Sequence, residues 1–311
     1  MKKNNTKSYL VEFKSIDNLL LPGLLFEPSA KTDKVALYLH GNGSASIFYS
    51  VSKINLLASE LLKNNIAFFP FNNRGAHYIH KLNRISNSEE KDVKLGTAYE
   101  LIKDCILDVD GAIDFLRTKG YEKFYLIGSS TGANKVVVYN YYKSNNAVSG
   151  YILLSGGDDT GLYYDMLGKK KFFSFLRKSR LMIEKGKGGE LIPQYLGGGL
   201  ISYQSLYDTI NPDGDYNVFP FNEYFNKLRL SKKPLFKEYK SINKPTLVIY
   251  GGQDEYCYGN VQKCVEALKK VCPNPNLFTF KILKGADHGF HGKEKELSKI
   301  ITGWLLGVNT E

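Results

Sequence analysis

The sequence lacks the features that mark disulfide-rich secreted proteins and membrane proteins. Only four of its 311 residues are cysteines, and none of them belongs to a C-x-x-C pair, which excludes a disulfide scaffold and favours reduced thiols. No stretch approaches the roughly 18 consecutive apolar residues that a spanning helix needs. Residues 1–7 are polar and basic, and no signal-peptide apolar run follows them. We therefore expect a soluble, cytoplasmic protein.

Acidic side chains are also scarce relative to basic ones. The chain has 42 Lys and Arg against 31 Asp and Glu, which gives a formal net charge of +11. Such an excess favours anionic partners such as nucleic acid, lipid headgroups or acidic substrates. Eight Lys or Arg against one Glu fall in residues 169–187 alone, and no nucleic-acid recognition motif accompanies them. The charge excess is therefore largely local, and we expect no nucleic-acid partner.

Short apolar segments alternate with longer segments of helical period over most of the chain, a pattern that predicts an α/β fold with a mostly parallel central sheet and helices on both faces. The first two strands are expected to form an antiparallel hairpin around Pro22-Gly23. Strands are predicted at residues 8–14, 19–26, 35–39, 67–71, 124–127, 151–154, 246–250 and 278–283, and helices at 47–63, 97–118, 133–143, 261–271 and 295–306.

The alternation stops in residues 158–243, which are rich in aromatic side chains and contain no convincing central strand. We predict a core made of residues 1–157 and 244–311 and a mainly helical cap over 158–243. Within this cap, helical spacing places Phe172, Phe175, Leu176 and Ile183 of the basic segment 169–187 on one face. Two interpretations fit: a cap helix whose apolar face covers the active site, or a peripheral contact with an anionic membrane or lipid.

The most specific motif is Gly128-Ser129-Ser130-Thr131-Gly132, placed between a predicted strand and a predicted helix. A G-x-S-x-G sequence at such a turn holds a serine on a strained backbone, with its hydroxyl clear of the neighbouring strand and helix. The helix N-terminus also favours a developing negative charge. We therefore predict Ser130 as a nucleophile, against the alternative of an ordinary Gly/Ser turn.

A serine nucleophile needs a base and a group that orients the base. His288 follows the last predicted strand in a short Gly-flanked loop, which favours it over its competitor His291. Asp254, which follows the strand at 246–250, is the predicted acid. Glu255 is a minor alternative, and Asp158 or Asp159 would serve if the acid followed the earlier strand at 151–154.

Acyl transfer also requires amides directed at an oxyanion. The loop His40-Gly41-Asn42-Gly43 follows a predicted strand, and we expect the backbone amides of Asn42 and Thr131 to supply the two donors, with His40 in a structural role. Gly41-x-Gly43 is not a dinucleotide fingerprint, because the third glycine position is occupied by Ser46. His77-x-x-His80 lies in a predicted polar loop with no nearby Cys or acidic cluster. We expect neither a metal nor a cofactor.

Together, His40-Gly41, Gly128 to Gly132, Gly252-x-Asp254 and Asp287-His288-Gly289 resemble the α/β-hydrolase superfamily. The likeness is greatest to the branch of monoacylglycerol lipases, lysophospholipases, serine aminopeptidases and feruloyl-type esterases. Members of that branch commonly carry Asp-x-Arg-Gly after the fourth strand, where this chain has Asn72-Asn73-Arg74-Gly75. We interpret Arg74 as a cation that fixes this loop.

The resemblance implies a serine hydrolase that cleaves a small-molecule carboxylic ester through an acyl-enzyme on Ser130, with a thioester or small amide as variants. The aromatic cap predicts an apolar or aromatic substrate portion. One alternative is a lysophospholipase or monoacylglycerol lipase acting at membrane surfaces, which the basic segment 169–187 motivates. The other is a non-catalytic ligand-binding protein on the same fold.

Overall fold

The computed structural model describes residues 7–86, 89–193 and 199–308. The first six residues, which belong to the polar start of the chain, lie outside this part. Eight strands form one sheet in the order β1-β2-β4-β3-β7-β8-β9-β10. Neighbours are parallel from β4 to β10, while β2 is antiparallel to both β1 and β4. These strands span Lys7–Lys14, Leu20–Glu27, Ala67–Phe71, Lys34–Leu39, Lys123–Ser129, Val148–Leu154, Thr246–Gly251 and Phe278–Leu283.

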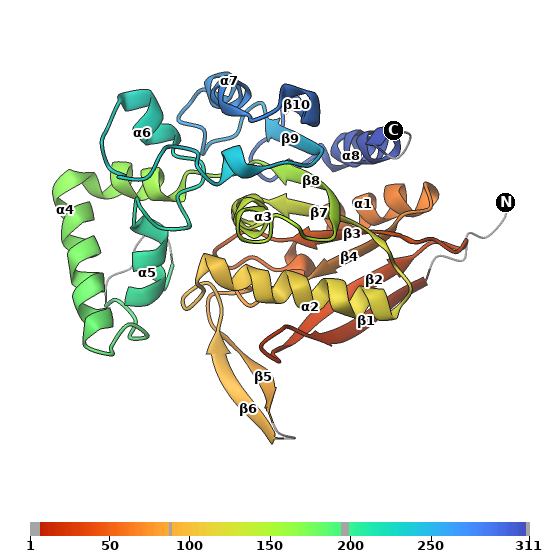
Figure 1. The fold of residues 1–311 in the computed structure, drawn as a ribbon, viewed down its shortest axis with the longest axis horizontal. Coiled ribbons are helices and arrows are strands. Elements are labelled where there is room, and N and C mark those ends of the chain that lie inside the picture. Colours follow the sequence, from red (N-terminus) through yellow and green to blue (C-terminus); the bar gives the residue numbers. More distant parts are fainter. Residues whose placement is uncertain (1–6, 87–88, 194–198, 309–311) are drawn as a thin grey trace.

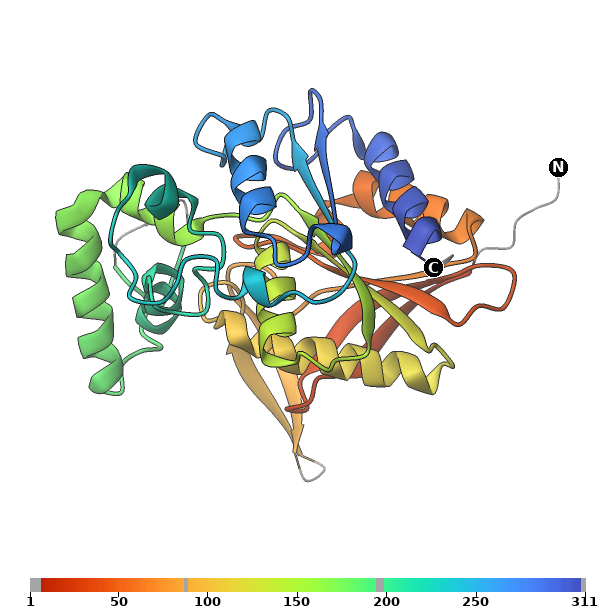
Figure 2. The same ribbon diagram turned by 45° about the horizontal axis from the view of Figure 1, so that its top comes forward.

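Helices cover both faces of the sheet (Figures 1 and 2). Helices α1 and α8 pack on one face, and α2, α3 and α7 pack on the other. The five span Val51–Lys63, Glu294–Val308, Cys105–Thr118, Thr131–Tyr142 and Val261–Val271, and short 3-10 turns occupy Ile47–Tyr49, Ile102–Asp104, Tyr239–Ser241 and Pro275–Leu277.

The central strands are apolar on both sides because both sides are covered. In β3, Leu37 and Leu39 join the hydrophobic core under α2 and α3, whereas Ala36 and Tyr38 join the core under α1 and α8. Alternate side chains of a strand point to opposite faces, so such a strand must be hydrophobic throughout. The predicted α/β class, with a mostly parallel sheet between two helical layers, is confirmed.

Two sequence predictions on the same side of the molecule are wrong in detail. The segment around His80, predicted as a polar loop, forms a two-stranded antiparallel hairpin of β5 (His80–Ser86) and β6 (Glu89–Leu95) that projects from the core (Figure 1). The helix predicted over 97–118 is helical only from residue 102 onward. The amide of Thr97 donates to the His77 carbonyl, and its hydroxyl donates to the carbonyls of Gly43 and Gly75, which commits this residue to tertiary contacts.

The segment 158–243 contains α4 (Asp159–Glu184), α5 (Tyr203–Ile210) and α6 (Phe221–Asn226), and its described residues add no strand to the large sheet. Residue Gly168 (φ 70°, ψ 157°) kinks α4. Beyond the kink, α4 and α5 share a small hydrophobic core of their own. The segment lies at one end of the molecule, beside the carboxyl ends of the parallel strands (Figure 1). None of the helices in the described ranges combines the length and apolar character needed to cross a bilayer.

Candidate active site

The predicted site residues come together at the carboxyl ends of the parallel strands. Ser130 follows β7 in the middle of the sheet, Asn42 follows β3 beside it, and His288 follows β10 at the edge. Asp254 follows β9, the neighbour of β10. In an open α/β sheet the loops at these strand ends converge, so residues far apart in sequence can share one site.

The backbone at Ser130 is strained, with φ 58° and ψ −130°. The two flanking glycines allow this turn. A Cβ on Gly128 would lie 2.2 Å from the Gly132 carbonyl oxygen, and a Cβ on Gly132 would lie 2.3 Å from the Leu39 carbonyl oxygen. Only glycine lets strand β7, helix α3 and strand β3 approach this closely. The G-x-S-x-G motif therefore has the strand-to-helix geometry expected of a nucleophile elbow.

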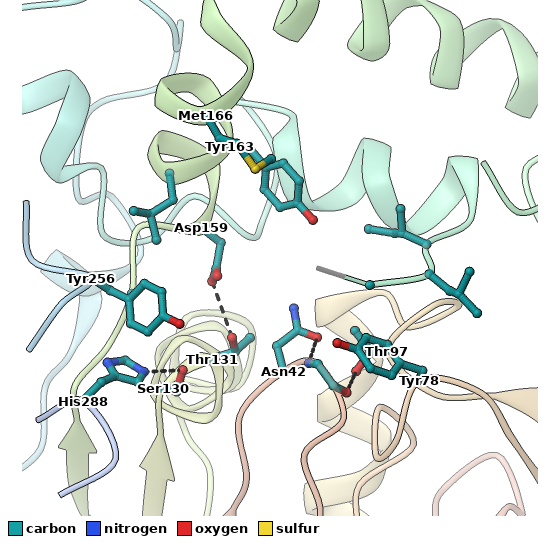
Figure 3. A pocket seen from close by; sticks show the side chains of 16 residues that line it. Asn42, Tyr78, Thr97, Ser130, Thr131, Asp159, Tyr163, Met166, Tyr256 and His288 are labelled. Atoms are coloured by element: carbon teal, nitrogen blue, oxygen red, sulfur yellow. Dashed lines mark hydrogen bonds between the residues drawn. The ribbon is translucent and has the colours of Figure 1, made fainter. Parts of the chain in front are cut away.

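His288, which faces Ser130 in Figure 3, connects the serine to a buried acid. Its Nε2 atom lies 2.8 Å from the Ser130 hydroxyl oxygen, and its Nδ1 atom lies 2.9 Å from Oδ1 of Asp254. Asp254 is only 3% exposed, and its Oδ1 also accepts the amide of Tyr256 at 3.0 Å. The carboxylate is thus fixed in place, and the arrangement can deliver a proton from Ser130 to His288.

The alternative acids have other partners. Glu255 accepts the backbone amide of His288 at 3.1 Å and does not bind its ring. Asp158 accepts the amides of Gly161 and Asn222, which makes it the N-cap of α4. Burial raises the pKa of Asp158 to about 7, although these two amides and the Tyr258 hydroxyl favour its ionised form. Neither carboxyl is placed to orient the His288 imidazole.

The alternative histidine is also placed elsewhere. His291 is largely exposed, and its Nδ1 atom lies 2.7 Å from the carboxylate of Asp287. Of the two histidines after β10, only His288 contacts Ser130.

The loop after β3 lies against the nucleophile. A Cβ on Gly41 would meet Cβ of Ser130 at 2.9 Å, so this loop needs glycine to approach the serine. The Asn42 side chain shapes the next residues, because Oδ1 accepts the amide of Gly43 and Nδ2 donates to the Tyr216 hydroxyl, both at 2.8 Å. Thr131 is the first residue of α3, where helix amides have no intrahelical acceptor.

The histidines that precede Ser130 have structural contacts. His40 is buried, and its Nδ1 atom lies 2.8 Å from the Gly41 carbonyl oxygen. Burial lowers the pKa of His40 to about 3, with the positive charge of Lys135 as a further cause. His77 pairs with the Tyr49 hydroxyl, and His80 with the Arg74 carbonyl. Within the described ranges, no three His, Cys, Asp or Glu side chains gather in a way that could hold a metal ion.

The Asn72-Asn73-Arg74-Gly75 loop is fixed from both ends. Oδ1 of Asn72 accepts the amide of Ile47 at 2.9 Å, so this residue anchors the chain that follows the Asn42 loop. The Arg74 guanidinium donates to Asp17 and to the fully buried Asp108, each at 2.7 Å. These contacts are those of a loop-fixing cation, as the sequence predicted.

A pocket of about 520 Å³ opens over Ser130. Its walls come from the core loops, from the first two turns of α4 and from the region around Ile201, and they combine aromatic and aliphatic side chains with polar ones (Figure 3). The lining includes Tyr78, Tyr163 and Tyr256, which the sequence reasoning did not single out. Only Tyr256 had a sequence indication, because it stands two residues after Asp254; the others reach the pocket through loop and helix packing.

The basic segment 169–187 forms the outer part of α4 and the turn after it. Phe172 is buried, and Phe175, Leu176 and Met182 pack with it against the core shared with α5. All eight Lys and Arg side chains of the segment are exposed. Three of the four side chains predicted on one apolar face, Phe172, Phe175 and Leu176, thus pack inside the segment 158–243, while its charges face outward. The fourth, Ile183, is not part of this core, and Met182 takes part instead.

A model of a protein family described as "Protein of unknown function (DUF1749)" matches residues 98–305. No curated protein matches the sequence. Among solved structures, the chain is similar to Est1E from Butyrivibrio proteoclasticus with bound ferulic acid (TM-score 0.62, 13% identity, covering 96% of this chain and 99% of that one). It is also similar to a soluble variant of monoglyceride lipase from Saccharomyces cerevisiae in complex with a substrate analogue (TM-score 0.62, 16% identity, 98% and 97%).

A third similar structure is the esterase Pf2001 from Pyrococcus furiosus (TM-score 0.55, 18% identity, covering 97% of this chain and 91% of that one). Because the sequence identities are this low, the similarity to these structures is evidence for the fold alone. It confirms the α/β-hydrolase fold that the sequence motifs predicted.

Proposed function

Because the chain belongs to the DUF1749 family and has the α/β-hydrolase fold, we propose that it is a serine hydrolase that cleaves a small-molecule carboxylic ester. The observation that carries this proposal is the continuous contact from Ser130 through His288 to Asp254, with Ser130 on a strained strand-to-helix turn. Three groups in this geometry perform nucleophilic acyl transfer on several unrelated folds.

In the proposed reaction, Oγ of Ser130 attacks the ester carbonyl carbon while Nε2 of His288 accepts the hydroxyl proton. Asp254 keeps Nδ1 protonated and stabilises the imidazolium that forms. The imidazolium then protonates the departing alkoxide, which leaves as the alcohol. Water, activated by the same imidazole, attacks the acyl-enzyme and releases the acid. A thioester or small amide would follow the same steps.

The negative charge on the carbonyl oxygen requires donors that are already in place. We assign this role to the backbone amides of Asn42 and Thr131, because the Asn42 loop contacts Ser130 and Thr131 begins α3. One such donor contributes roughly 2.7 to 4 kcal/mol to the transition state. The segment 158–243 acts as the cap, since Leu162, Tyr163 and Met166 of α4 form one wall of the pocket.

The direct test is hydrolysis of p-nitrophenyl esters of increasing acyl length by the wild-type protein and by Ser130→Ala. We expect turnover by the wild type and none above background by the variant. A sharp preference for acetyl over octanoyl would assign short esters. Turnover that survives Ser130→Ala would contradict the proposal, and absence of turnover together with specific ligand binding would favour the alternative of a non-catalytic binding protein.

Anionic vesicles test the alternative of a lipase acting at membrane surfaces. The packing of α4 against α5 accounts for the apolar face of the segment 169–187 without a lipid, so we expect activity to be unchanged by such vesicles. Neutralising Lys169 to Lys171 should likewise leave turnover unaltered. If vesicles strongly activated the protein and these substitutions abolished the activation, the alternative of a lipase acting at membrane surfaces would replace our proposal.

A further inference from the structure

Two consecutive acids stand at the start of α4, and only Asp158 is its N-cap. Asp158 accepts the amides of Gly161 and Asn222 and the Tyr258 hydroxyl, which satisfies the N-cap of α4. The next residue, Asp159, turns the other way. Its carboxylate points into the pocket above the nucleophile (Figure 3). The N-cap of α4 therefore accounts for Asp158 and not for the direction in which the Asp159 carboxylate points.

Asp159 lies beside Thr131 and lines the same pocket as Ser130 and His288. Its Oδ2 atom is 3.5 Å from Oγ1 of Thr131, the residue whose amide we assign to the oxyanion. Burial raises the pKa of Asp159 to about 6, although the neighbouring His288 and the Thr131 hydroxyl favour its ionised form. At neutral pH this carboxyl is therefore largely ionised, a negative charge next to a site where negative charge develops.

A carboxylate in this position works against an oxyanion unless the substrate brings a compensating charge. Among the described residues that line the pocket, Asp159 is the one carboxylate, and none is a Lys or Arg. The remaining wall includes the rings of Tyr78, Tyr163 and Tyr256. Aromatic faces attract organic cations, and so does a carboxylate that has no Lys or Arg beside it in the pocket wall.

We propose that Asp159 determines specificity by selecting esters that carry an ammonium group close to the scissile carbonyl. This inference rests on the proposed function and names its substrate class. The ammonium group binds the Asp159 carboxylate between the tyrosine rings, and it neutralises the charge that would otherwise oppose the oxyanion. An ester with a carboxylate or phosphate at the same place is rejected.

The experiment compares esters that differ only in charge. The first pair is the p-nitrophenyl esters of β-alanine and of butyric acid, in which a methyl group replaces the ammonium. The second pair is acetylcholine and its neutral analogue with carbon in place of the ammonium nitrogen, so that the charge lies on the alcohol. We measure kcat/KM for all four with the wild type, Asp159→Asn and Asp165→Asn. Asp165 is an exposed acid of the same helix and serves as the matched control.

In at least one pair, the wild type and Asp165→Asn should prefer the cationic ester by about tenfold or more, and Asp159→Asn should lose that preference. The neutral ester of the pair should be hydrolysed by Asp159→Asn at least as well as by the wild type. The specificity role of Asp159 would be overturned if Asp159→Asn left the cationic-to-neutral ratio of kcat/KM unaltered in both pairs. The proposed hydrolase function would stand in that case, provided that a fluorophosphonate still labels Ser130. If the fluorophosphonate did not label the wild type, both the specificity role and the proposed hydrolase function would be overturned.

A pH series gives a readout that a merely structural role would not move. The cationic-to-neutral ratio should fall as the pH drops through about 6, where Asp159 takes up a proton. Any change with pH that is common to both esters cancels in the ratio. The same series with Asp159→Asn should be flat, and a wild-type ratio that stays constant would overturn the proposal. The other titratable groups that interact with Asp159 are Lys135, Asp158, Tyr163, Tyr216 and Tyr256.

Discussion

Nδ1 of His288 lies 2.9 Å from Oδ1 of Asp254, and the same oxygen accepts the amide of Tyr256. The amide fixes the carboxylate, and the carboxylate in turn fixes the ring so that Nε2 faces Ser130. The ring of Tyr256 packs edge-on against that of His288, with 4.6 Å between centroids. Residues 254–256 thus set both the tautomer and the direction of the imidazole, which a base needs before it can act.

The first prediction concerns this acid. Asp254→Asn should reduce kcat about a thousandfold to ten-thousandfold, because the amide stabilises neither the required tautomer nor the imidazolium. Glu255→Gln is the matched control, since Glu255 binds only the backbone of His288, and it should change kcat less than about tenfold. Steady-state kinetics on one activated ester measures both. Full activity of Asp254→Asn would contradict the assignment of the acid.

The second prediction concerns the turn that carries Ser130. Gly132→Ala places a methyl group 2.3 Å from the Leu39 carbonyl oxygen, so strand β3 or helix α3 must move. The free energy of unfolding should fall by about 1–3 kcal/mol or more, and activity should be lost. Gly303→Ala is the control, because nothing lies within 4 Å of its added Cβ on helix α8. It should leave stability unchanged or raise it by up to about 1 kcal/mol. Urea unfolding measures the free energy of unfolding of both variants. Equal values for Gly132→Ala and Gly303→Ala would refute the steric explanation.

The third prediction is a pH dependence of stability that arises from His40. The folded protein keeps this imidazole neutral down to a pKa of about 3, mainly because burial disfavours its charge. The unfolded chain takes up the proton near its ordinary pKa of about 6.5. His40 therefore contributes stability above pH 6.5, and this contribution is lost as the pH falls toward 3, by up to about 1.4 kcal/mol per pH unit.

The comparison of wild type with His40→Gln isolates this effect. The difference between their free energies of unfolding should shrink as the pH falls over that range. Raised carboxyl pKa values, such as those of Asp158 and Asp208 at about 7, act in the opposite direction but are common to both proteins and cancel. Denaturant unfolding at several pH values measures the difference. A difference that does not change with pH would show that His40 is not held neutral.

The sequence predicted the large sheet and the placement of Ser130, His288 and Asp254 because the determinants are local. Continuous apolar strands, flanking turns and the glycines around Ser130 each specify a neighbourhood of a few residues. Parallel strands then bring their carboxyl ends to one edge, so the three residues converge without further information. Their catalytic roles remain predictions for the experiments above.

The hairpin β5–β6 and the pocket wall escaped prediction because they depend on distant contacts. The hairpin is mostly polar. Leu95 joins the core and Leu82 and Val93 pack against it, and these three are too few to show a strand pattern. Asp159 was weighed as an alternative acid for the imidazole, whereas the fold of α4 turns its carboxylate toward Thr131. Such placements follow from how the segment 158–243 folds back over the strand ends, which no local pattern encodes.

Covalent labelling of the nucleophile tests whether Ser130 reacts as a serine hydrolase nucleophile. The wild-type protein is incubated with a fluorophosphonate, and the modified peptide is identified by mass spectrometry. We expect one adduct on Ser130, formed fast in the wild type, strongly slowed in His288→Ala and absent in Ser130→Ala. Failure of the folded wild type to react, or an adduct that persists undiminished in Ser130→Ala, would contradict the claim that this protein is a serine hydrolase.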